Sequence, residues 1–185
     1  DLVGFAASIY KRGIKYINVP TTLLSMVDAS VGGKTGIDFN GIKNSVGNFY
    51  PPLSILSDAT FLESLPEKEL HSGWAEVIKH LLISNVTIPQ LLPNISNNHL
   101  TDWSGVKHTI IREDPYEKGV RLALNAGHTV GHAIEAHYLQ HNKSMPHGFA
   151  IAAGLWIEAF ITKEIFQDEW AFNQINTGIS KVYKK

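Results

Sequence analysis

Apolar residues recur at helical spacing along three stretches of the chain. Residues 2–10, 67–84 and 123–138 place apolar side chains three or four positions apart, a spacing that gathers them on one face of a helix. From about Asp58 onward this spacing dominates. The pattern therefore predicts a mainly helical second part of the molecule.

Shorter stretches before Asp58 predict strands and turns. Residues 14–19 alternate apolar and polar side chains, and residues 54–56 follow a Pro-Pro break, so each predicts a short strand. The glycine-rich residues 30–35 predict a flexible loop. The first part is therefore expected to be of the α/β type, with a domain boundary after residue 57.

Some stretches lack these signals. Residues 94–102 are polar and predict a loop, and residues 167–185 carry no clear pattern. The chain opens without Met, on an apolar run at residues 1–7 that is typical of the interior of a fold. These features predict a fragment of a longer protein.

Composition narrows the classes of function. Of 185 residues, 44% are hydrophobic and 18% charged, which is ordinary for a soluble globular protein. The net charge is −1 and no basic cluster occurs, which argues against nucleic acid or an anionic membrane as a partner. The absence of cysteine excludes disulfides and thiolate ligands. Small-molecule ligands and a cytoplasmic location are therefore expected, and no membrane-spanning run is visible.

The histidines near the middle of the chain have the spacing of metal ligands. His128 and His132 are four apart, so on a helix both rings project from one face, and His147 follows fifteen residues later. Glu76 offers a carboxylate, and His80 on the same predicted helix is a rival ligand. A lone helical histidine is usually a surface or core residue, but three together with one carboxylate favour Zn²⁺ and a catalytic site with one open position.

The Gly32-Gly33-Lys34-Thr35 segment predicts an anion site. A nucleotide P-loop would need glycine five positions before Gly33, where Asp28 stands, so that interpretation fails. Paired glycines still expose backbone N–H groups to an oxyanion, and Lys34 adds charge. The alternative is a glycine turn with a solvated lysine. Lys43-Asn44 offers a second cation with an amide beside it.

Two further pairs sit at helical spacing. Glu76 and Lys79 are three apart, which also describes an ordinary surface ion pair, although Glu76 stands among apolar neighbours. Arg121 and Asn125 are four apart and precede His128 by about one turn. A face with a guanidinium, an amide and imidazoles is costly to bury without a polar ligand, so a cavity that binds one is predicted.

Five blocks in this order resemble 3-dehydroquinate synthase: VPTTLLSMVDASVGGKTGID, GIKNSVGNFYPP, AEVIK, EKGVRLALNAGHTVGHAIEA and HGFAIAAG. The resemblance covers residues 1–159. It implies conversion of 3-deoxy-D-arabino-heptulosonate 7-phosphate (DAHP) to 3-dehydroquinate and phosphate in the shikimate pathway, which leads to chorismate and the aromatic amino acids. It also implies bound NAD, a Zn²⁺ ion that Co²⁺ could replace, and a cytoplasmic homodimer.

The resemblance implies a role for particular residues. Glu76, His128 and His147 match zinc ligands, and His132 matches a histidine linked to proton transfer. Positions that line the substrate pocket are matched by Asp28, Lys34, Asn44, Lys79, Lys107, Glu117, Arg121 and Asn125, of which Lys34, Lys79, Lys107, Arg121 and Asn125 are expected to be catalytic together with His132. The phosphate side is matched by Arg12 and Lys43. Cofactor contacts are matched by Asp1, Thr21, Thr22, Leu24, Lys34, Lys43, Phe61, Ser64 and Leu65.

The resemblance also implies a domain plan with parts missing. Residues 1–57 would be the C-terminal portion of a Rossmann-like α/β NAD-binding domain, and residues 58–185 a helical zinc- and substrate-binding domain. The glycine-rich nucleotide strand expected before Asp1 is absent, as is a lysine near the family's C-terminus, so the fragment alone is expected to be inactive. Phe149 stands where many members have Glu, and residues 167–185 do not resemble the family's continuation.

Other functions remain open beside this one. Another sugar-phosphate cyclase, such as a 2-deoxy-scyllo-inosose synthase, would share the zinc and NAD chemistry, but Arg121 and Asn125 suit a substrate that carries a carboxylate. A metal-dependent polyol dehydrogenase would leave the cations Lys34 and Lys43 without a purpose. The alternative that is not an enzyme is a non-catalytic remnant that binds metal or a partner protein.

Overall fold

The computed structural model describes residues 2–40, 42–89 and 93–183. Along the chain, the elements are α1 (Leu2–Ile9), η1 (Tyr10–Arg12), β1 (Ile17–Asn18), η2 (Ser25–Ala29), β2 (Lys34–Phe39), β3 (Ile42–Phe49), β4 (Ser54–Ile55), η3 (Ala59–Leu62), α2 (Glu67–Ile83), α3 (Asn97–Glu113), η4 (Val120–Asn125), α4 (His128–Gln140), α5 (His147–Phe166) and α6 (Trp170–Val182). Helices thus dominate the second part, as the spacing of apolar residues predicts.

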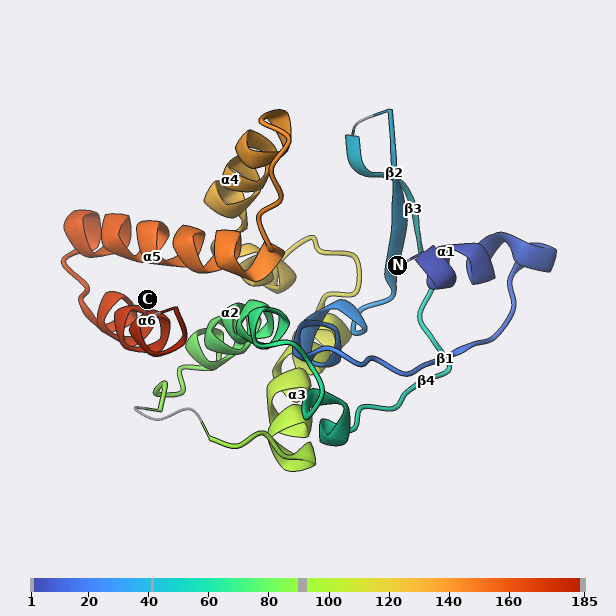
Figure 1. The fold of residues 1–185 in the computed structure, drawn as a ribbon, viewed down its shortest axis with the longest axis horizontal. Helices are drawn as coiled ribbons and strands as arrows, with labels where there is room; N and C mark the ends of the chain where they lie inside the picture. The colour runs from blue at the N-terminus through green and yellow to red at the C-terminus, as the bar shows by residue number, and fades with distance from the viewer. Residues whose placement is uncertain (1, 41, 90–92, 184–185) are drawn as a thin grey trace.

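The strands of the first part form two small pairs. β1 and β4 pair in parallel, with Ile17 opposite Ser54. β2 and β3 form an antiparallel hairpin with an irregularity between Ile37 and Phe39. In Figure 1 the hairpin stands up beside α1, on the opposite side of the molecule from α5 and α6. Residues of both its strands, among them Lys34 and Asn48, line a cavity.

Helix α2 lies at the centre of the helical part. Every residue from Ser72 to His80 is buried, including the charged Glu76 and Lys79. The core around α2 joins apolar side chains of η2, α3, α5 and α6, and Trp74 packs edge to face against Trp103 at 5.2 Å between ring centroids. Because this helix is enclosed on several sides, its polar residues must be satisfied by neighbouring elements.

Three boundaries differ from the sequence prediction. The predicted helix over 123–138 is interrupted, because Gly127 adopts a left-handed conformation (φ 77°) and α4 starts at His128. The predicted loop over 94–102 is wrong from Asn97, where Ser96 caps α3 through a capping box with His99. The predicted loop over 30–35 ends at Gly33, since β2 begins at Lys34.

The C-terminal stretch is also ordered, contrary to the absence of a recognisable pattern in its sequence. Helix α6 buries Ile175 and Val182, and the Asp168 carboxylate accepts a hydrogen bond of 2.9 Å from the Trp170 N–H before its first turn. Its apolar side chains complete the core against α2 and α5. No helix within the described ranges combines the length and apolar character that a bilayer crossing requires.

Candidate active site

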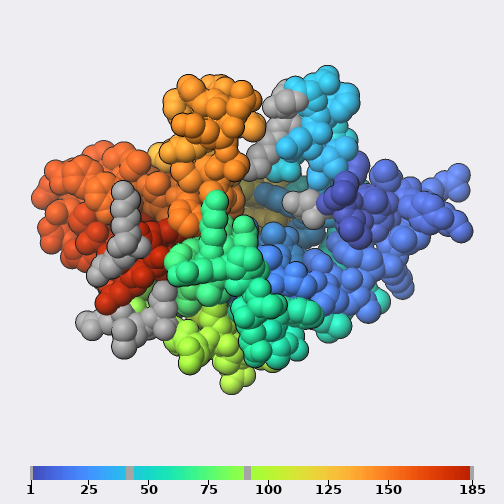
Figure 2. Space-filling view, viewed as in Figure 1, coloured from blue at the N-terminus to red at the C-terminus, as the bar shows by residue number. Residues whose placement is uncertain are grey.

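A cavity of about 730 Å³ lies between the hairpin and the start of α4. Figure 2 shows this face of the molecule hollowed between the tip of the hairpin and α4. Lys79, from the buried stretch of α2, lies at its floor. The predicted site residues that line it are Leu24, Asp28, Lys34, Asn44, Lys79, Lys107, Glu117, Arg121, Asn125, His128, His132 and His147.

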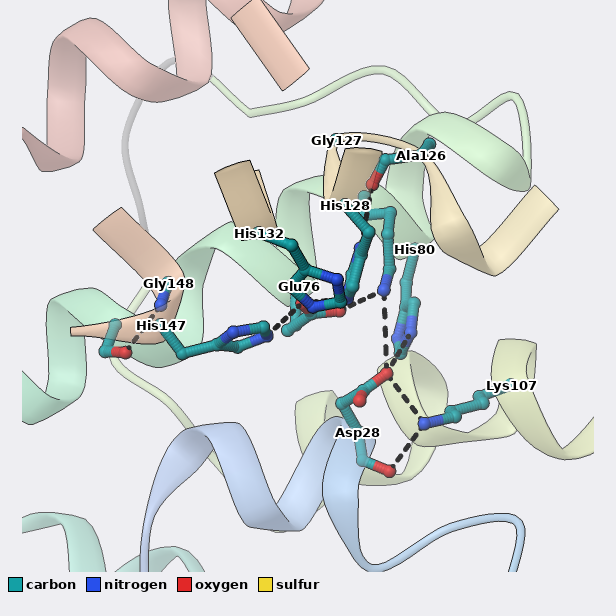
Figure 3. Close-up of polar contacts among 12 residues, drawn as sticks. Asp28, Glu76, His80, Lys107, Ala126, Gly127, His128, His132, His147 and Gly148 are labelled. Carbon is teal, nitrogen blue, oxygen red and sulfur yellow. Dashed lines mark hydrogen bonds and ion pairs between the residues drawn. The ribbon is translucent and has the colours of Figure 1, made fainter. Parts of the chain in front are cut away.

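The three predicted metal ligands converge from three helices. Glu76 comes from the middle of α2, while His128 and His147 are the first residues of α4 and α5. The Nε2 atoms of His128 and His147 lie 3.9 and 3.6 Å from Glu76 Oε1. Figure 3 shows their rings, with that of His132, gathered around the Glu76 carboxylate.

This arrangement fits a divalent cation. One ligand atom from each of the three residues falls within a group whose members are all within 4.8 Å of one another. Glu76 is completely buried, and among the described residues its oxygens find no hydrogen bond beyond the ion pair with Lys79. A buried carboxylate without such partners is costly, and two imidazoles with one carboxylate are a common zinc ligand set.

The charges around Glu76 keep Glu76 and His128 in states suited to metal binding, whereas the pKa of His147 is raised, because the contacts with Glu76 and Glu135 outweigh its burial. Burial and the Asp28 carboxylate raise the pKa of Glu76, but Lys79 and the two histidines outweigh them, and the net pKa lies below its usual value. Burial and the nearby Lys79 lower the pKa of His128. A metal needs an ionised carboxylate and a neutral imidazole, so both shifts favour ligation.

Asp28 holds two cations beside the candidate metal cluster. Lys79 is buried beside Glu76, and its Nζ lies 3.7 Å from Asp28 Oδ1. Burial alone would lower the pKa of Lys79, but Glu76 and Asp28 raise it, so the amine stays charged. Lys107 donates a hydrogen bond of 2.8 Å to the Asp28 backbone carbonyl and lies 2.8 Å from its Oδ1. Asp28 thus fixes both amines at the cavity floor.

The opposite side of the cavity carries Arg121. Its guanidinium is buried and donates hydrogen bonds to the carbonyls of Pro115 (2.6 Å) and Gly32 (3.5 Å). Glu117 forms an ion pair with Lys34 and accepts a hydrogen bond of 2.7 Å from Asn125 Nδ2. These contacts join the loop before η4 to the glycine-rich segment before β2. Of the predicted anion-binding groups, Lys34 and Arg121 therefore meet at this cavity.

A single carboxylate organises the loop that carries Glu117 and Arg121. Asp114 accepts hydrogen bonds from the backbone N–H groups of Lys118 (2.9 Å), Gly119 (2.7 Å) and Arg121 (3.1 Å). The bond from Lys118, with those from Gly119 and Arg121, lowers the pKa of Asp114. Asp114 was not among the predicted site residues, although its position seven residues before Arg121 could have suggested a turn-forming role.

Some predicted site residues do not line this cavity. Arg12 is exposed in η1, and Thr21, Thr22, Phe61, Ser64 and Leu65 are also absent from the cavity wall. Asp1 and the side chain of Lys43 lie outside the described residues. The roles expected for these residues, most of them in cofactor binding, stay predictions.

One residue near the cluster, Glu135, was not predicted, and one rival ligand that the sequence offered, His80, makes other contacts. Glu135 on α4 lies 3.1 Å from His147 Nδ1, and its place three positions after His132 is a signal that the sequence offered. His80, a rival ligand by sequence, instead has its Nδ1 3.0 Å from the Trp103 carbonyl oxygen and its Nε2 3.4 Å from Asp28 Oδ1. Its ring is therefore directed to Asp28 and away from the histidine pair.

Family models match nearly the whole chain. The model described as 3-dehydroquinate synthase N-terminal matches residues 1–72, and the model described as 3-dehydroquinate synthase C-terminal matches residues 73–183. The second match includes α6, so the expectation that residues 167–185 depart from the family is wrong up to residue 183.

Curated relatives agree with these models. The chain is 45% identical over 174 residues to a 3-dehydroquinate synthase of Parabacteroides distasonis, covering 89% of this chain and 49% of that relative. It is 43% identical over 200 residues to the 3-dehydroquinate synthase of Sulfolobus acidocaldarius, covering 97% of this chain and 56% of that relative. The chain thus spans about half the length of the curated relatives it matches.

Solved structures confirm the expected fold class. A 2-deoxy-scyllo-inosose synthase, solved with carbaglucose-6-phosphate, NAD⁺ and Co²⁺, is 29% identical with a TM-score of 0.79, covering 95% of this chain and 52% of that chain. A 2-epi-5-epi-valiolone synthase of Streptomyces hygroscopicus, solved with NAD⁺ and Zn²⁺, is 23% identical with a TM-score of 0.83 and is similar in fold. It covers 100% of this chain and 54% of that chain.

Proposed function

Because the chain belongs to the 3-dehydroquinate synthase family, we propose that it provides the metal and substrate site of an enzyme that converts DAHP to 3-dehydroquinate and phosphate. The observation that carries this proposal is the Glu76, His128 and His147 cluster, which opens onto a cavity walled by the cations Lys34, Lys107 and Arg121. The reaction would be a phosphate-eliminating step of the shikimate pathway.

The cluster would hold Zn²⁺ through Glu76, His128 and His147, with Co²⁺ as a substitute. When bound, the metal would polarise a substrate hydroxyl and NAD would accept and later return hydride, so that no net redox change occurs. The NAD⁺ and Co²⁺ or Zn²⁺ recorded in the related cyclase structures support this cofactor set.

The chain's own residues would bind the anionic groups of the substrate. Lys34 and Lys107 face the cavity as cations suited to a phosphate. Two backbone carbonyls already orient the Arg121 guanidinium, which keeps further N–H donors for a carboxylate. Fixing a charged group before the substrate arrives lowers the cost of binding, so Arg121 would favour a substrate that carries a carboxylate.

His132 would move the proton. Its ring lies 5.2 Å from that of His128 between centroids, and 53% of its side chain is exposed at the cavity. A histidine that is open to the substrate and close to the metal ligands suits a general acid or base near neutral pH. His132 is therefore proposed as catalytic and not as a metal ligand.

The test measures phosphate release from DAHP by a protein of the relatives' full length that contains these residues, with and without NAD, and with and without a metal chelator. Release that requires both NAD and metal is expected. Glu76→Gln or His128→Ala should remove metal and turnover together, whereas His132→Ala should keep the metal and lose rate by about 10²- to 10⁴-fold. His137→Ala, at an exposed histidine of the same helix, serves as the matched control. Metal that stays bound in both ligand variants would refute the site.

A second function is another sugar-phosphate cyclase reaction. It is favoured by the similarity to 2-deoxy-scyllo-inosose synthase, solved with carbaglucose-6-phosphate. The same assay with glucose 6-phosphate separates the two. Phosphate release from glucose 6-phosphate in preference to DAHP would assign the sister reaction and would mean that Arg121 does not select a carboxylate.

The cytoplasmic homodimer implied by the family is part of the same proposal. The domain boundary after residue 57 likewise stays a prediction.

A further inference from the structure

The arrangement of α4 and α5 assigns a role to Glu135: we propose that it is a positioning residue that orients the metal ligand His147. This inference rests on the metal centre of the proposed function. It concerns a carboxylate that neither the motif blocks nor the cavity wall had singled out.

The two nitrogens of the His147 ring face two different carboxylates. Nδ1 donates a hydrogen bond of 3.1 Å to Glu135 Oε1, because a carboxylate can only accept. Nε2 lies 3.6 Å from Glu76 Oε1, on the side where His128 also approaches. A proton held on Nδ1 leaves the lone pair of the neutral ring on Nε2. That is the nitrogen which faces the metal group.

Glu135 lies where it could orient a ligand from outside the metal cluster. It follows His132 by three positions on α4, and its Oε2 lies 3.9 Å from His132 Nε2. Only 17% of its side chain is exposed. A carboxylate this far removed from water is costly unless it has a defined partner, and the His147 ring provides one. One carboxylate therefore contacts both a proposed ligand and the proposed proton carrier.

A histidine ligand works best when its outer nitrogen is fixed. The outer hydrogen bond selects the tautomer, holds the ring plane and makes the inner nitrogen more basic, and losing such a partner typically costs about 10- to 100-fold in metal affinity. His147 starts α5 directly after Pro146, so no preceding helical turn restrains its side chain. The bond to Glu135 supplies that restraint.

The competing role for Glu135 is that of a ligand. His132, Glu135 and His147 also form a group whose ligand atoms lie within 4.8 Å of one another. That group would need the same His147 ring, whose Nδ1 already donates to Glu135. Positioning and ligation predict different metal stoichiometries, so one titration distinguishes them.

The test titrates the metal-free protein with Co²⁺ and follows both affinity and visible absorption. Wild-type protein should bind one equivalent. Glu135→Ala should still bind one equivalent, about 10- to 100-fold more weakly and with an altered Co²⁺ spectrum. Glu135→Gln should recover part of the affinity, because its amide oxygen still accepts from Nδ1–H without the negative charge. Glu164→Gln, at an exposed glutamate on α5, is the matched control and should leave both readouts unchanged.

The outcomes separate this inference from the proposed function. Unchanged affinity and spectrum in both Glu135 variants would overturn the positioning role and leave the metal centre standing. Two equivalents in wild type, with one lost in Glu135→Ala, would make Glu135 a ligand and also overturn it. If Glu135→Ala does not fold by circular dichroism, Glu135→Gln decides. Normal Co²⁺ behaviour without phosphate release from DAHP, in a protein of the relatives' full length that contains these residues, would refute the enzymatic proposal alone.

Discussion

The contact between α2 and α5 at Gly148 should control both stability and the metal cluster. The Gly148 N–H donates a hydrogen bond of 3.0 Å to Ser72 Oγ in the buried interior. A Cβ at this position would lie 2.5 Å from the Ser72 carbonyl carbon and closer still to its oxygen, whereas ordinary contact begins at 3.4 Å. Gly148→Ala therefore requires the two helices to separate by about 1 Å or more.

The free-energy cost of Gly148→Ala depends on how readily the backbone of α2 at Ser72 can move. Overpacking a core typically costs about 1–3 kcal/mol, and because the obstructing atoms are backbone within a helix, the upper end is expected. His147 adjoins Gly148, so the same separation should draw its ring away from Glu76 and weaken Co²⁺ binding. Gly105→Ala on α3 is the control. Nothing lies within 4 Å of its added Cβ, and the change should stabilise by about 0.5–1 kcal/mol.

Urea unfolding followed by tryptophan fluorescence measures this effect, since Trp74 and Trp103 are buried in the affected core. The Co²⁺ titration is carried out on the same samples. A Gly148→Ala protein that matched wild type in both unfolding free energy and Co²⁺ affinity would show that α2 and α5 adjust without disturbing the site. That result would refute the reasoning from close packing.

Two further changes probe the charges. Lys79→Met leaves Glu76 buried without its cation and should lower the unfolding free energy of the metal-free protein, measured in urea, by about 3–5 kcal/mol. A decrease of only about 1 kcal/mol, as for an exposed ion pair, would contradict the burial argument. The N–H groups of Lys118, Gly119 and Arg121 lower the pKa of Asp114. The ionised Asp114 should therefore stabilise the fold at any pH above the usual pKa of Asp. This contribution should be lost as the pH falls through the lowered pKa. Asp114→Asn should therefore lose less Tm than wild type between pH 7 and about pH 3, and equal losses would remove Asp114 from this role.

The spacing of apolar residues predicted those helices and strands in which the local sequence pattern agrees with the burial of the residues in the fold. Helix α2 (Glu67–Ile83) and the strands around Ile17 and Ser54 lie where the pattern of apolar and polar residues indicates. The β2–β3 hairpin was not predicted, although Asn40-Gly41 is a common turn pair between alternating strands. Each strand contains one glycine, and only four of their fourteen residues are β-branched, so the strand signal was weak.

Tertiary contacts decided the remaining boundaries. Nothing in the spacing of residues 123–138 required a break, and the left-handed Gly127 is explained by its approach to Leu155 and the Ile151 carbonyl of α5. Helix α6 places Phe172, Ile175 and Val182 against α2 and α5, and its spacing is helical once the core is known. The sequence of α6 alone did not distinguish this face from an irregular segment.

The site illustrates the difference between residue identity and burial. The spacing of Glu76 and Lys79 places them side by side on α2, but an exposed ion pair has the same spacing. What makes this pair unusual is the close approach of other elements: a Cβ on Gly73 would lie 2.5 Å from Leu23 Cβ, and a Cβ on Gly148 would lie closer still to the Ser72 carbonyl oxygen. Gly73 lets the segment that carries Asp28 approach α2 closely, and Gly148 does the same for the helix that begins with His147. The stretch of α2 that holds Glu76 and Lys79 is therefore buried between these two elements. The residue types of the cluster therefore predicted its chemistry. The burial that sets the charges of Glu76 and Lys79 depends on close contacts at glycines, which a single sequence does not reveal.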